Sequence, residues 1–274
     1  MNPSTPLRAA PKEQGRGERA RVTFLGTGTS HGVPMIACEC GTCTSADPRD
    51  QRLRPSVLVD LPGGRTLLID AAPDLRAQAL RHRIRRVDAI LFTHAHADHV
   101  LGLDETRRFT ALQRCAMPCY GDAETIAEIR RVFAYAFRGG QEGGGVPRLE
   151  LIPVSAPFDA AGQRVVPVPV FHGELAIYGY RLGQFAYLTD CSRIPDSSWP
   201  LLEGVRVLVI DALRDVPHPT HFTLEQALEA VVRIAPDRAL LTHVSHDLGH
   251  AATSSRLPPR VELAYDGLIV DIEL

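Results

Sequence analysis

The order of strand-like and helical runs predicts an α/β protein in which two packed sheets are covered on the outside by helices. The chain has 274 residues, enough for one large domain, and a hydrophobic fraction of 45% is ordinary for a globular protein. Some strand-like runs follow one another directly, whereas others are separated by helical patterns. This order fits two packed sheets better than one parallel sheet with regular alternation.

Short β-prone runs mark the strands, and Gly26-Thr27-Gly28 breaks the first of them. Residues 1–20 are rich in proline, glycine and charge, so we expect a disordered tail there and a single domain over residues 21–274. The expected strands are Arg21–Leu25, Ser56–Asp60, Thr66–Asp70, Ala89–Thr93, Arg164–Phe171, Ala176–Leu182, Phe185–Thr189, Val205–Asp211, Arg238–Thr242 and Leu268–Ile272.

Apolar residues at helical spacing predict helices between these strands. One such pattern places Leu224, Ala227, Leu228 and Val231 on one face. We expect a flexible glycine-rich loop over residues 139–145. The expected helices are Pro73–Arg83, Leu103–Gln113, Ala123–Phe137 and Thr223–Ile234.

Charge and hydropathy exclude several classes of partner. With 30 basic and 32 acidic side chains the formal net charge is −2, so no large positive field draws in polyanions and nucleic acid is not an expected partner. No apolar run reaches the ~18–20 residues that cross a bilayer, and the N-terminus lacks the apolar centre of a secretory signal. We therefore expect a cytoplasmic protein that does not bind membranes. Its six cysteines are then thiols or metal ligands rather than disulfides.

Four side chains able to bind metals follow a buried strand-like run. His94, His96, Asp98 and His99 come directly after the apolar Ala89–Thr93. Alternation along the strand sends His94 and His96 to the same side, and Asp98 and His99 stand where a helix could begin. Imidazole and carboxylate ligands suit zinc, iron or manganese, and a catalytic site keeps one position open for water. Surface histidines in a loop are the alternative, but four possible ligands at this spacing favour a metal site.

The pattern H-x-H-x-D-H resembles that of the metallo-β-lactamase superfamily, and the resemblance extends from about Val22 to the C-terminus. It implies an αββα sandwich of four layers. It also directs attention to His172, Asp190 and His243, which follow later strand-like runs as the superfamily's remaining ligands do. By this resemblance one metal is held by His94, His96 and His172, and the other by Asp98, His99 and His243, with Asp190 bridging the two.

Three of the six cysteines, Cys38, Cys40 and Cys43, lie within a span of six residues. The C-x-C and C-x-x-C spacings suit a tight turn around one tetrahedral zinc ion, which needs a fourth ligand. A reduced loop and a redox dithiol are the alternatives, although no thioredoxin-like context accompanies these residues. Cys115 and Cys119 are expected to be buried small hydrophobes, and nothing requires Cys191 to bind a metal.

A second resemblance concerns the phosphodiesterases of PhnP type. These enzymes combine the two-metal site with a cysteine turn of this kind, and they share the Gly-Thr-Gly strand end and the Gly-Val-Pro turn seen here at residues 26–28 and 32–34. Their Thr-His-x-Ser-His motif stands here at residues 242–246. The match implies that His243 enters the catalytic site and that His246 completes the structural zinc site.

Two further features have both a chemical and a structural interpretation. His221 resembles the histidine that precedes a helix in these phosphodiesterases, where it would act as a general acid or bind phosphate; otherwise it only leads into a helix. Gly26, Gly28 and Gly32 could let backbone amides approach a phosphate, or they simply form a turn. We expect His31 and His218 to be loop residues.

The resemblance implies a phosphodiesterase with two divalent ions, zinc or manganese, in the active site and one structural zinc. The substrate would be a small cyclic phosphate or nucleotide-like phosphodiester. A metal-bound hydroxide would attack phosphorus, Asp98 would orient it and His221 would protonate the leaving oxygen. Glu174 departs from the family's pattern, because it places an acid where a basic residue would grip phosphate.

The alternatives are an endoribonuclease that processes transfer RNA 3′ ends and a non-catalytic metal or ligand sensor on the same scaffold. The ribonucleases typically add an extended arm that grips the substrate, and residues 121–147 are too short for a convincing one. A sensor would be favoured by an incomplete ligand set, whereas all seven positions are filled. The oligomeric state stays open, with a homodimer among the alternatives.

Overall fold

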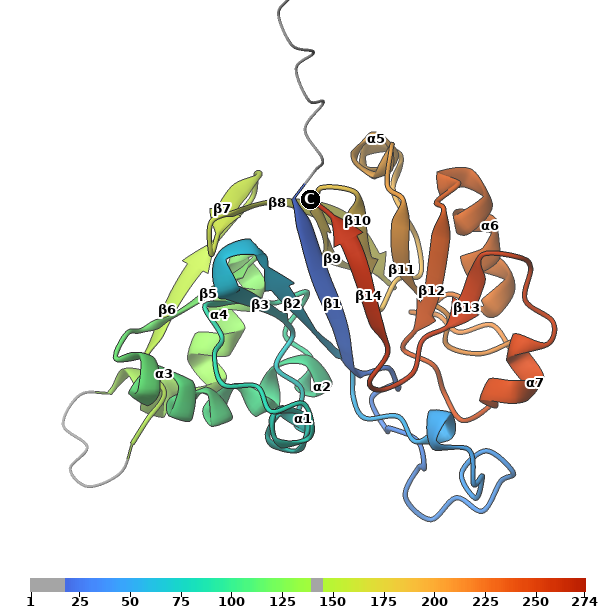
Figure 1. Cartoon of the computed structure of the whole chain (residues 1–274), viewed down its shortest axis with the longest axis horizontal. Helices are drawn as coiled ribbons and strands as arrows, with labels where there is room; N and C mark the ends of the chain where they lie inside the picture. The colour runs from blue at the N-terminus through green and yellow to red at the C-terminus, as the bar shows by residue number, and fades with distance from the viewer. Residues whose placement is uncertain (1–17, 139–144) are drawn as a thin grey trace, which may run out of the picture.

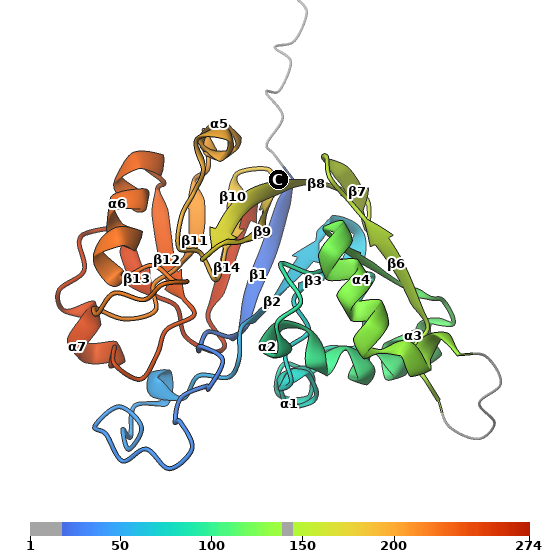
Figure 2. The same cartoon turned by 180° about the vertical axis from the view of Figure 1, so that it is seen from behind.

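The computed structural model describes residues 18–138 and 145–274, which form two seven-stranded sheets packed face to face (Figures 1 and 2). Helices cover the outer face of each sheet, so the predicted αββα sandwich is confirmed. Residues 1–17 of the expected tail and residues 139–144 of the expected loop lie outside the described residues. The first strand begins at Arg19, which shows that the tail prediction extended too far into the fold.

The first sheet has the order β14-β1-β2-β3-β4-β5-β6. The pairs from β14 to β3 are antiparallel and those from β3 to β6 are parallel. Its strands are β1 (Arg19–Gly26), β2 (Ser56–Leu61), β3 (Arg65–Ile69), β4 (Ala89–Leu91), β5 (Met117–Gly121), β6 (Leu149–Pro153) and β14 (Ile269–Glu273).

The second sheet has the order β13-β12-β11-β10-β9-β8-β7 and repeats this plan. Strands β7 to β10 pair antiparallel, and β10 to β13 pair parallel. Its strands are β7 (Phe158–Ala160), β8 (Gln163–His172), β9 (Leu175–Leu182), β10 (Phe185–Leu188), β11 (Val207–Asp211), β12 (Arg238–Thr242) and β13 (Val261–Leu263).

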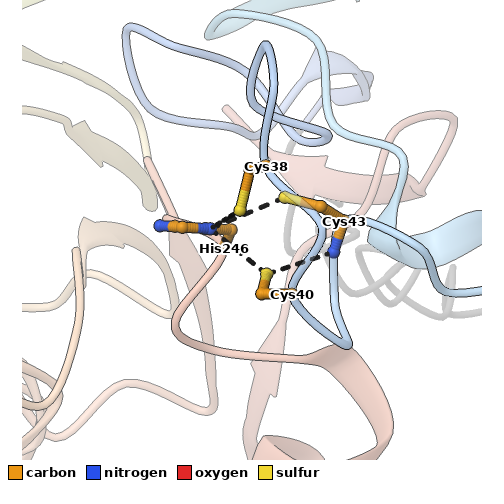
Figure 3. Close-up of side chains that lie close together, drawn as sticks. All are labelled: Cys38, Cys40, Cys43 and His246. Carbon is orange, nitrogen blue, oxygen red and sulfur yellow. Dashed lines mark hydrogen bonds between the residues drawn. The ribbon is translucent and has the colours of Figure 1, made fainter.

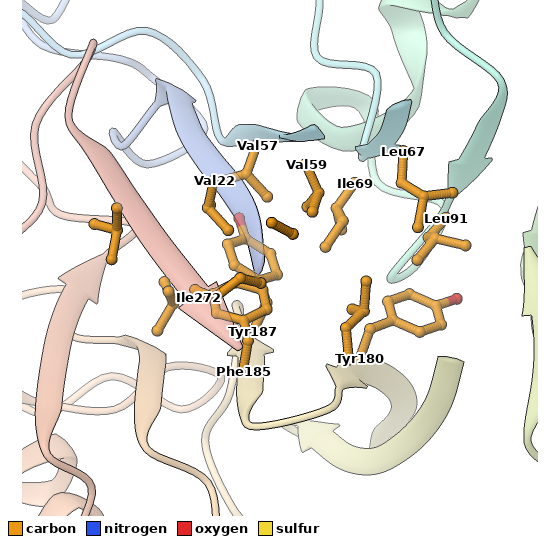
Figure 4. Close-up of a cluster of buried hydrophobic side chains, with 14 of the residues drawn as sticks. Val22, Val57, Val59, Leu67, Ile69, Leu91, Tyr180, Phe185, Tyr187 and Ile272 are labelled. Atoms are coloured by element: carbon orange, nitrogen blue, oxygen red, sulfur yellow. The ribbon is translucent and has the colours of Figure 1, made fainter. Parts of the chain in front are cut away.

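The main core lies between the two sheets, where alternating residues of facing strands interdigitate (Figure 4). Val57 and Val59 of β2 belong to it on one side, and Phe185 and Tyr187 of β10 on the other. Such alternation sends every second side chain of a strand to the same face. Tyr180 of β9 adds a polar link, because its buried hydroxyl donates to the carbonyl of Phe92 at 2.7 Å. This bond fixes the segment that leads to His94.

The helices cover the outer faces through two further apolar clusters. α1 (Leu75–Arg81), α3 (Arg107–Gln113) and α4 (Ala123–Val132) cover the first sheet, while α5 (Trp199–Leu202) and α6 (Leu224–Ile234) cover the second. The short helix α2 (Ala97–Val100) lies beside the 3₁₀ segment Leu101–Thr106, and α7 (His250–Ser254) lies beside β13. At the start of α6 the Thr223 side chain accepts from the Gln226 amide, and Gln226 accepts from the Thr223 amide. This capping box fixes where the helix starts, three residues after His221.

Four strands were not predicted, β5, β6, β7 and β13. β6, β7 and β13 lie toward the ends of their sheets, β7 and β13 have three residues each, and β6 is half-exposed. β5 contains Pro118, which cannot donate to a ladder. The predicted helix Leu103–Gln113 is a 3₁₀ segment followed by α3, and Ala123–Phe137 likewise continues past α4 as a 3₁₀ turn. Within the described residues, no helix has the length and apolar character needed to cross a membrane.

Candidate metal centre

The residues predicted to bind two metals come together at one edge of the sandwich. His94 follows β4, His172 ends β8, Asp190 lies two residues after the end of β10, and His243 directly follows β12. Asp98 and His99 lie in α2, as the sequence predicted. Asp190 and His243 have φ angles of 52° and 57°. Such left-handed geometry is uncommon for residues other than glycine and often occurs at functional sites.

The donor atoms form two adjacent sets. One contains His94, His96 and His172, and the other contains Asp98, His99, Asp190 and His243; within each set the donor atoms lie within 4.8 Å of one another. Asp190 stands between the sets. Its Oδ2 is 3.8 Å from His94 Nε2, and its Oδ1 is 3.2 Å from both His99 Nε2 and His243 Nδ1.

These donor atoms fit metal ions because hydrogen bonds do not satisfy them. His94 Nε2, His99 Nε2, His243 Nδ1 and Asp98 Oδ2 are all buried, and none has a hydrogen-bond partner within the described parts of the chain. A buried polar atom without a partner costs ~1–3 kcal/mol or more, which bound cations would offset. Unpaired donors directed at a shared centre are what a metal site requires.

Asp70 is a site residue that the sequence analysis missed, because it was assigned only to the end of a strand. It follows β3 and is fully buried. His99 Nδ1 donates to its Oδ2 at 2.7 Å, and the Thr93 amide and hydroxyl donate to its two oxygens at 2.9 Å each. The carboxylate therefore fixes the tautomer of His99 and directs Nε2 toward the donor set.

His221 has a matching partner in Asp211, which also escaped the sequence analysis. His221 Nδ1 donates to Asp211 Oδ2 at 3.0 Å, so Nε2 is turned to the side of the metal donors. A donor atom of His221 lies within 4.8 Å of those of His172 and Asp190. The preceding residue contributes too, because the Thr220 carbonyl accepts from His172 Nδ1 at 2.8 Å.

The electrostatics of the centre favour a charged Asp190 and neutral His94 and His243, whereas the neighbouring carboxylates outweigh burial and raise the pKa of His99. Burial alone would raise the pKa of Asp190, but His243 and His99 hold it well below its usual range. Burial lowers the pKa of His94, and it lowers the pKa of His243 to about 4. Neutral imidazole is the form that binds metals. For the second pair, burial raises the pKa of Asp211 to about 7, while the Asp211 carboxylate outweighs burial and raises the pKa of His221.

The three cysteines of the early loop meet His246, as predicted (Figure 3). His246 Nδ1 lies 3.2, 3.3 and 3.5 Å from the sulfurs of Cys38, Cys40 and Cys43. A hydrogen bond from the Cys43 amide lowers the pKa of Cys40 to about 6, whereas burial raises that of Cys43 to about 11. A cation at the centre of this tetrad would favour the thiolate form of all three.

The remaining cysteines only partly match their predictions. Cys119 is fully buried, as expected, but Cys115 is exposed and the prediction for it was wrong, because it follows the end of α3 and precedes β5. Cys191 is buried in the apolar cluster outside the second sheet. Glu174 is exposed in the turn between β8 and β9.

Two cavities adjoin the metal centre. One of about 450 Å³ includes His94 and His96 in its wall and has Leu175, Ala176 and Ile177 among its lining residues. The other, of about 240 Å³, reaches His221 and contains His31 and His218, which do lie in loops as predicted. A row of neighbouring rings connects the two cavities: His96 to His172 at 5.0 Å between centroids, and His172 to His221 at 4.6 Å.

Comparison with known proteins places this geometry in a family. Residues 65–244 match the family described as the beta-lactamase superfamily domain. The chain belongs to the beta-lactamase superfamily. The metallo-β-lactamase fold of this superfamily implies divalent metal ions, in agreement with the unpaired donors at the strand ends.

Three proteins that are similar to this chain carry different functional descriptions. A crystal structure described as a new diphosphatase from the PhnP family is 45% identical, with a TM-score of 0.88, and the match covers 93% of this chain and 98% of that one. An octanoyltransferase of Porphyromonas gingivalis is 39% identical over 252 residues, which are 90% of this chain and 51% of that protein. This chain therefore spans about half the length of that relative. A ribonuclease Z of Bradyrhizobium is 32% identical over 146 residues, 51% of this chain and 47% of that protein.

Proposed function

We propose that the chain hydrolyses a small molecule in which one phosphorus atom carries two substituents through oxygen. This class contains cyclic or nucleotide-like phosphodiesters as well as diphosphates. The observation that carries the proposal is the pair of donor sets joined at Asp190, with the His221–Asp211 pair beside them. The similarity to a PhnP-family diphosphatase supports the choice of a phosphoryl centre over an amide or thioester.

In this proposal one divalent ion is held by His94, His96 and His172, a second by Asp98, His99 and His243, and Asp190 bridges them. Zinc and manganese both suit nitrogen and oxygen donors of this kind. When bound, the two ions supply hydroxide near neutral pH and stabilise charge on the attacking and leaving oxygens. Cys38, Cys40, Cys43 and His246 hold a separate structural zinc.

The chain's own residues complete the chemistry. Asp98 Oδ2 has no hydrogen-bond partner in the described part of the chain. In this proposal it orients the attacking water. His221 donates a proton from Nε2 to the leaving oxygen, which otherwise departs as an unstable alkoxide. Asp211 holds Nδ1–H, so that the ring keeps its orientation while the proton on Nε2 is transferred.

A substrate panel on enzyme of defined metal content tests this proposal. We expect turnover of bis(p-nitrophenyl) phosphate, a 2′,3′-cyclic nucleotide or a nucleoside diphosphate derivative, and incorporation of ¹⁸O from water into the phosphate product. The matched control is His96→Ala, which removes one proposed ligand and should abolish turnover. Metal-replete protein that leaves every member of the panel intact would overturn the proposal.

An RNA substrate is the second candidate, supported by the ribonuclease Z relative that aligns with half of the chain. The balance of 30 basic and 32 acidic residues provides no large positive field for RNA. Cleavage of a precursor transfer RNA at its 3′ end, together with a shift of that RNA on a native gel, would favour the ribonuclease over the small-molecule enzyme.

A further inference from the structure

The smaller cavity beside the metal centre has one arginine and several histidines in its wall. Residues 29–32 of the loop after β1, Met35, residues 245–247 and several residues after β11 line its space of about 240 Å³. Arg214, His218 and His221 come from the segment after β11, and His31 faces the same space from the other loop. Asp247 is its single carboxylate, and that side chain accepts from the Ser245 hydroxyl at 2.9 Å.

Arg214 keeps hydrogen-bonding capacity for a ligand. Its Nε donates to the Val216 carbonyl at 3.1 Å and its Nη2 to the Pro217 carbonyl at 3.5 Å, while Nη1 makes no hydrogen bond within residues 18–138 and 145–274. No carboxylate of those residues pairs with Arg214 in a salt bridge. A guanidinium has five N–H donors in a planar fork that suits phosphate, so its two loop contacts leave donors unused.

The loop after β1 offers donors on the same cavity. The backbone N–H groups of Ser30 and His31 make no hydrogen bond to any described residue, whereas those of Thr29 and Gly32 on either side are paired. Gly32 has a φ of +67°, a conformation that glycine adopts without strain. Successive free amides in a turn are a common device for binding anions.

We propose that this cavity is a subsite for a second phosphate group of the substrate, with Arg214 as its cation and His31 as an auxiliary hydrogen-bonding side chain. The subsite begins at His221, whose ring is 4.6 Å from that of His172 and 5.1 Å from that of His218, centroid to centroid. A phosphorus atom at the metal centre therefore has His221 beside its leaving oxygen and the cationic cavity beyond. Burial, together with His221 and Arg214, lowers the pKa of His218, so this ring adds a neutral hydrogen-bonding group to the cavity wall and the charge comes from Arg214.

The inference rests on the proposed function and narrows it to diphosphates over simple diesters. The larger cavity, with Leu175, Ala176 and Ile177 on its wall, would then take the organic part of the molecule at the other end of the histidine row. Attack at the phosphorus beside the metals breaks the P–O–P bridge. Water supplies one oxygen to that phosphorus, and the second phosphate leaves with the proton from His221.

The test compares Arg214→Gln with the wild-type enzyme on two substrates. For a nucleoside diphosphate derivative we expect KM to rise about tenfold or more, because a charge-assisted contact is lost. For bis(p-nitrophenyl) phosphate, which has a single phosphoryl group, KM should stay within about twofold. His31→Gln should raise the diphosphate KM in the same direction but less; its side chain is exposed and makes no hydrogen bond to a described residue, so folding is not at risk.

Calorimetric titration of the metal-loaded enzyme with inorganic diphosphate provides a readout that needs no turnover. Its affinity should fall about tenfold in Arg214→Gln, and it should not change in the control Arg206→Gln. Arg206 precedes β11 at the strand's opposite end and is paired with Asp237, so the control removes the same charge away from the cavity. Equal effects on both substrates, or unchanged diphosphate affinity in both cavity variants, would overturn the subsite. If the wild type hydrolyses neither substrate, the proposed function fails, while the titration still decides whether the cavity binds diphosphate.

Discussion

His99 and Asp70 form a buried pair 29 residues apart in sequence, with His99 Nδ1 donating to Asp70 Oδ2 at 2.7 Å. Both side chains are fully shielded from solvent. The same carboxylate accepts from the amide and the hydroxyl of Thr93, the residue before His94. One acid therefore orients two adjacent segments that carry proposed metal ligands.

Asp70→Asn should weaken metal binding at the centre while leaving the fold in place. The amide nitrogen of asparagine would face a donor, so His99 loses the bond that fixes its tautomer, and loss of such an outer partner typically costs ~10–100-fold in metal affinity. Competition with a chromophoric chelator measures this change. Asp60→Asn, at an exposed position of β2, is the matched control. Unaltered zinc and manganese affinities in Asp70→Asn would show that the pair has no such role.

His221→Gln should lower kcat/KM more for substrates with a poor leaving group than for substrates with a good one. A general acid contributes ~10²–10⁴-fold when an alkoxide departs, and far less for p-nitrophenolate, which leaves without protonation. Values of kcat/KM for an alkyl and a p-nitrophenyl ester of the same phosphate separate the two cases. Asp211→Asn should give an intermediate loss with the same dependence. If kcat/KM falls equally for both esters, His221 binds phosphate rather than donating a proton.

Cys38→Ser should remove one zinc ion per chain and destabilise the early loop. Cys38, Cys40 and Cys43 meet His246 across more than 200 residues of sequence, so the metal ties the loop to the segment that follows His243. Because binding energy at a structural site is also folding energy, we expect the melting temperature to fall by ~5 °C or more. Native mass spectrometry counts the ions, and calorimetry gives the melting temperature. Cys115→Ser, which changes an exposed thiol outside the tetrad, should alter neither.

Stability should depend on pH through Asp266. Burial raises its pKa from 3.8 to about 6, although the Leu53 amide and the Thr27 hydroxyl donate to it at 2.7 and 2.8 Å. The folded state thus binds this proton more tightly than the unfolded state. Its contribution is fully present below pH ~4 and is lost as the pH rises through ~6.

Urea unfolding at several pH values between about 4 and 7 tests this, with the wild type compared with Asp266→Asn at each pH. The asparagine cannot ionise, so the free energy of unfolding of the wild type relative to the variant should decrease across this window. A difference that stays constant with pH would contradict the assignment. The amide's own hydrogen-bonding cost does not vary with pH, so only the slope is diagnostic.

The features that could be predicted from the sequence are those that depend on residues close together in the chain. Four metal donors within His94–His99, three thiols within Cys38–Cys43 and the β-prone runs ahead of His172, Asp190 and His243 are each set by short-range spacing. Most strand predictions match within two residues, because a buried strand needs a continuous apolar run. The strands that escaped, β5, β6, β7 and β13, are short, half-exposed or interrupted by Pro118, so their pairing depends on neighbours supplied by the fold.

The acids that hydrogen-bond to the site histidines could be identified only from the folded structure. Asp70 and Asp211 lie at the ends of apolar strands, where the sequence indicates nothing more than the end of a strand. Their hydrogen-bond partners His99 and His221 reach them only in the folded chain. The cavity of Arg214 and His31 likewise joins two loops more than 180 residues apart. The physical reason is that spacing along the chain fixes local geometry, whereas hydrogen-bond partners and cavities between loops depend on how the two sheets pack. The His94–His99 run indicated a metal site, and the packing of the two sheets placed Asp70, Asp211 and a cationic cavity around it.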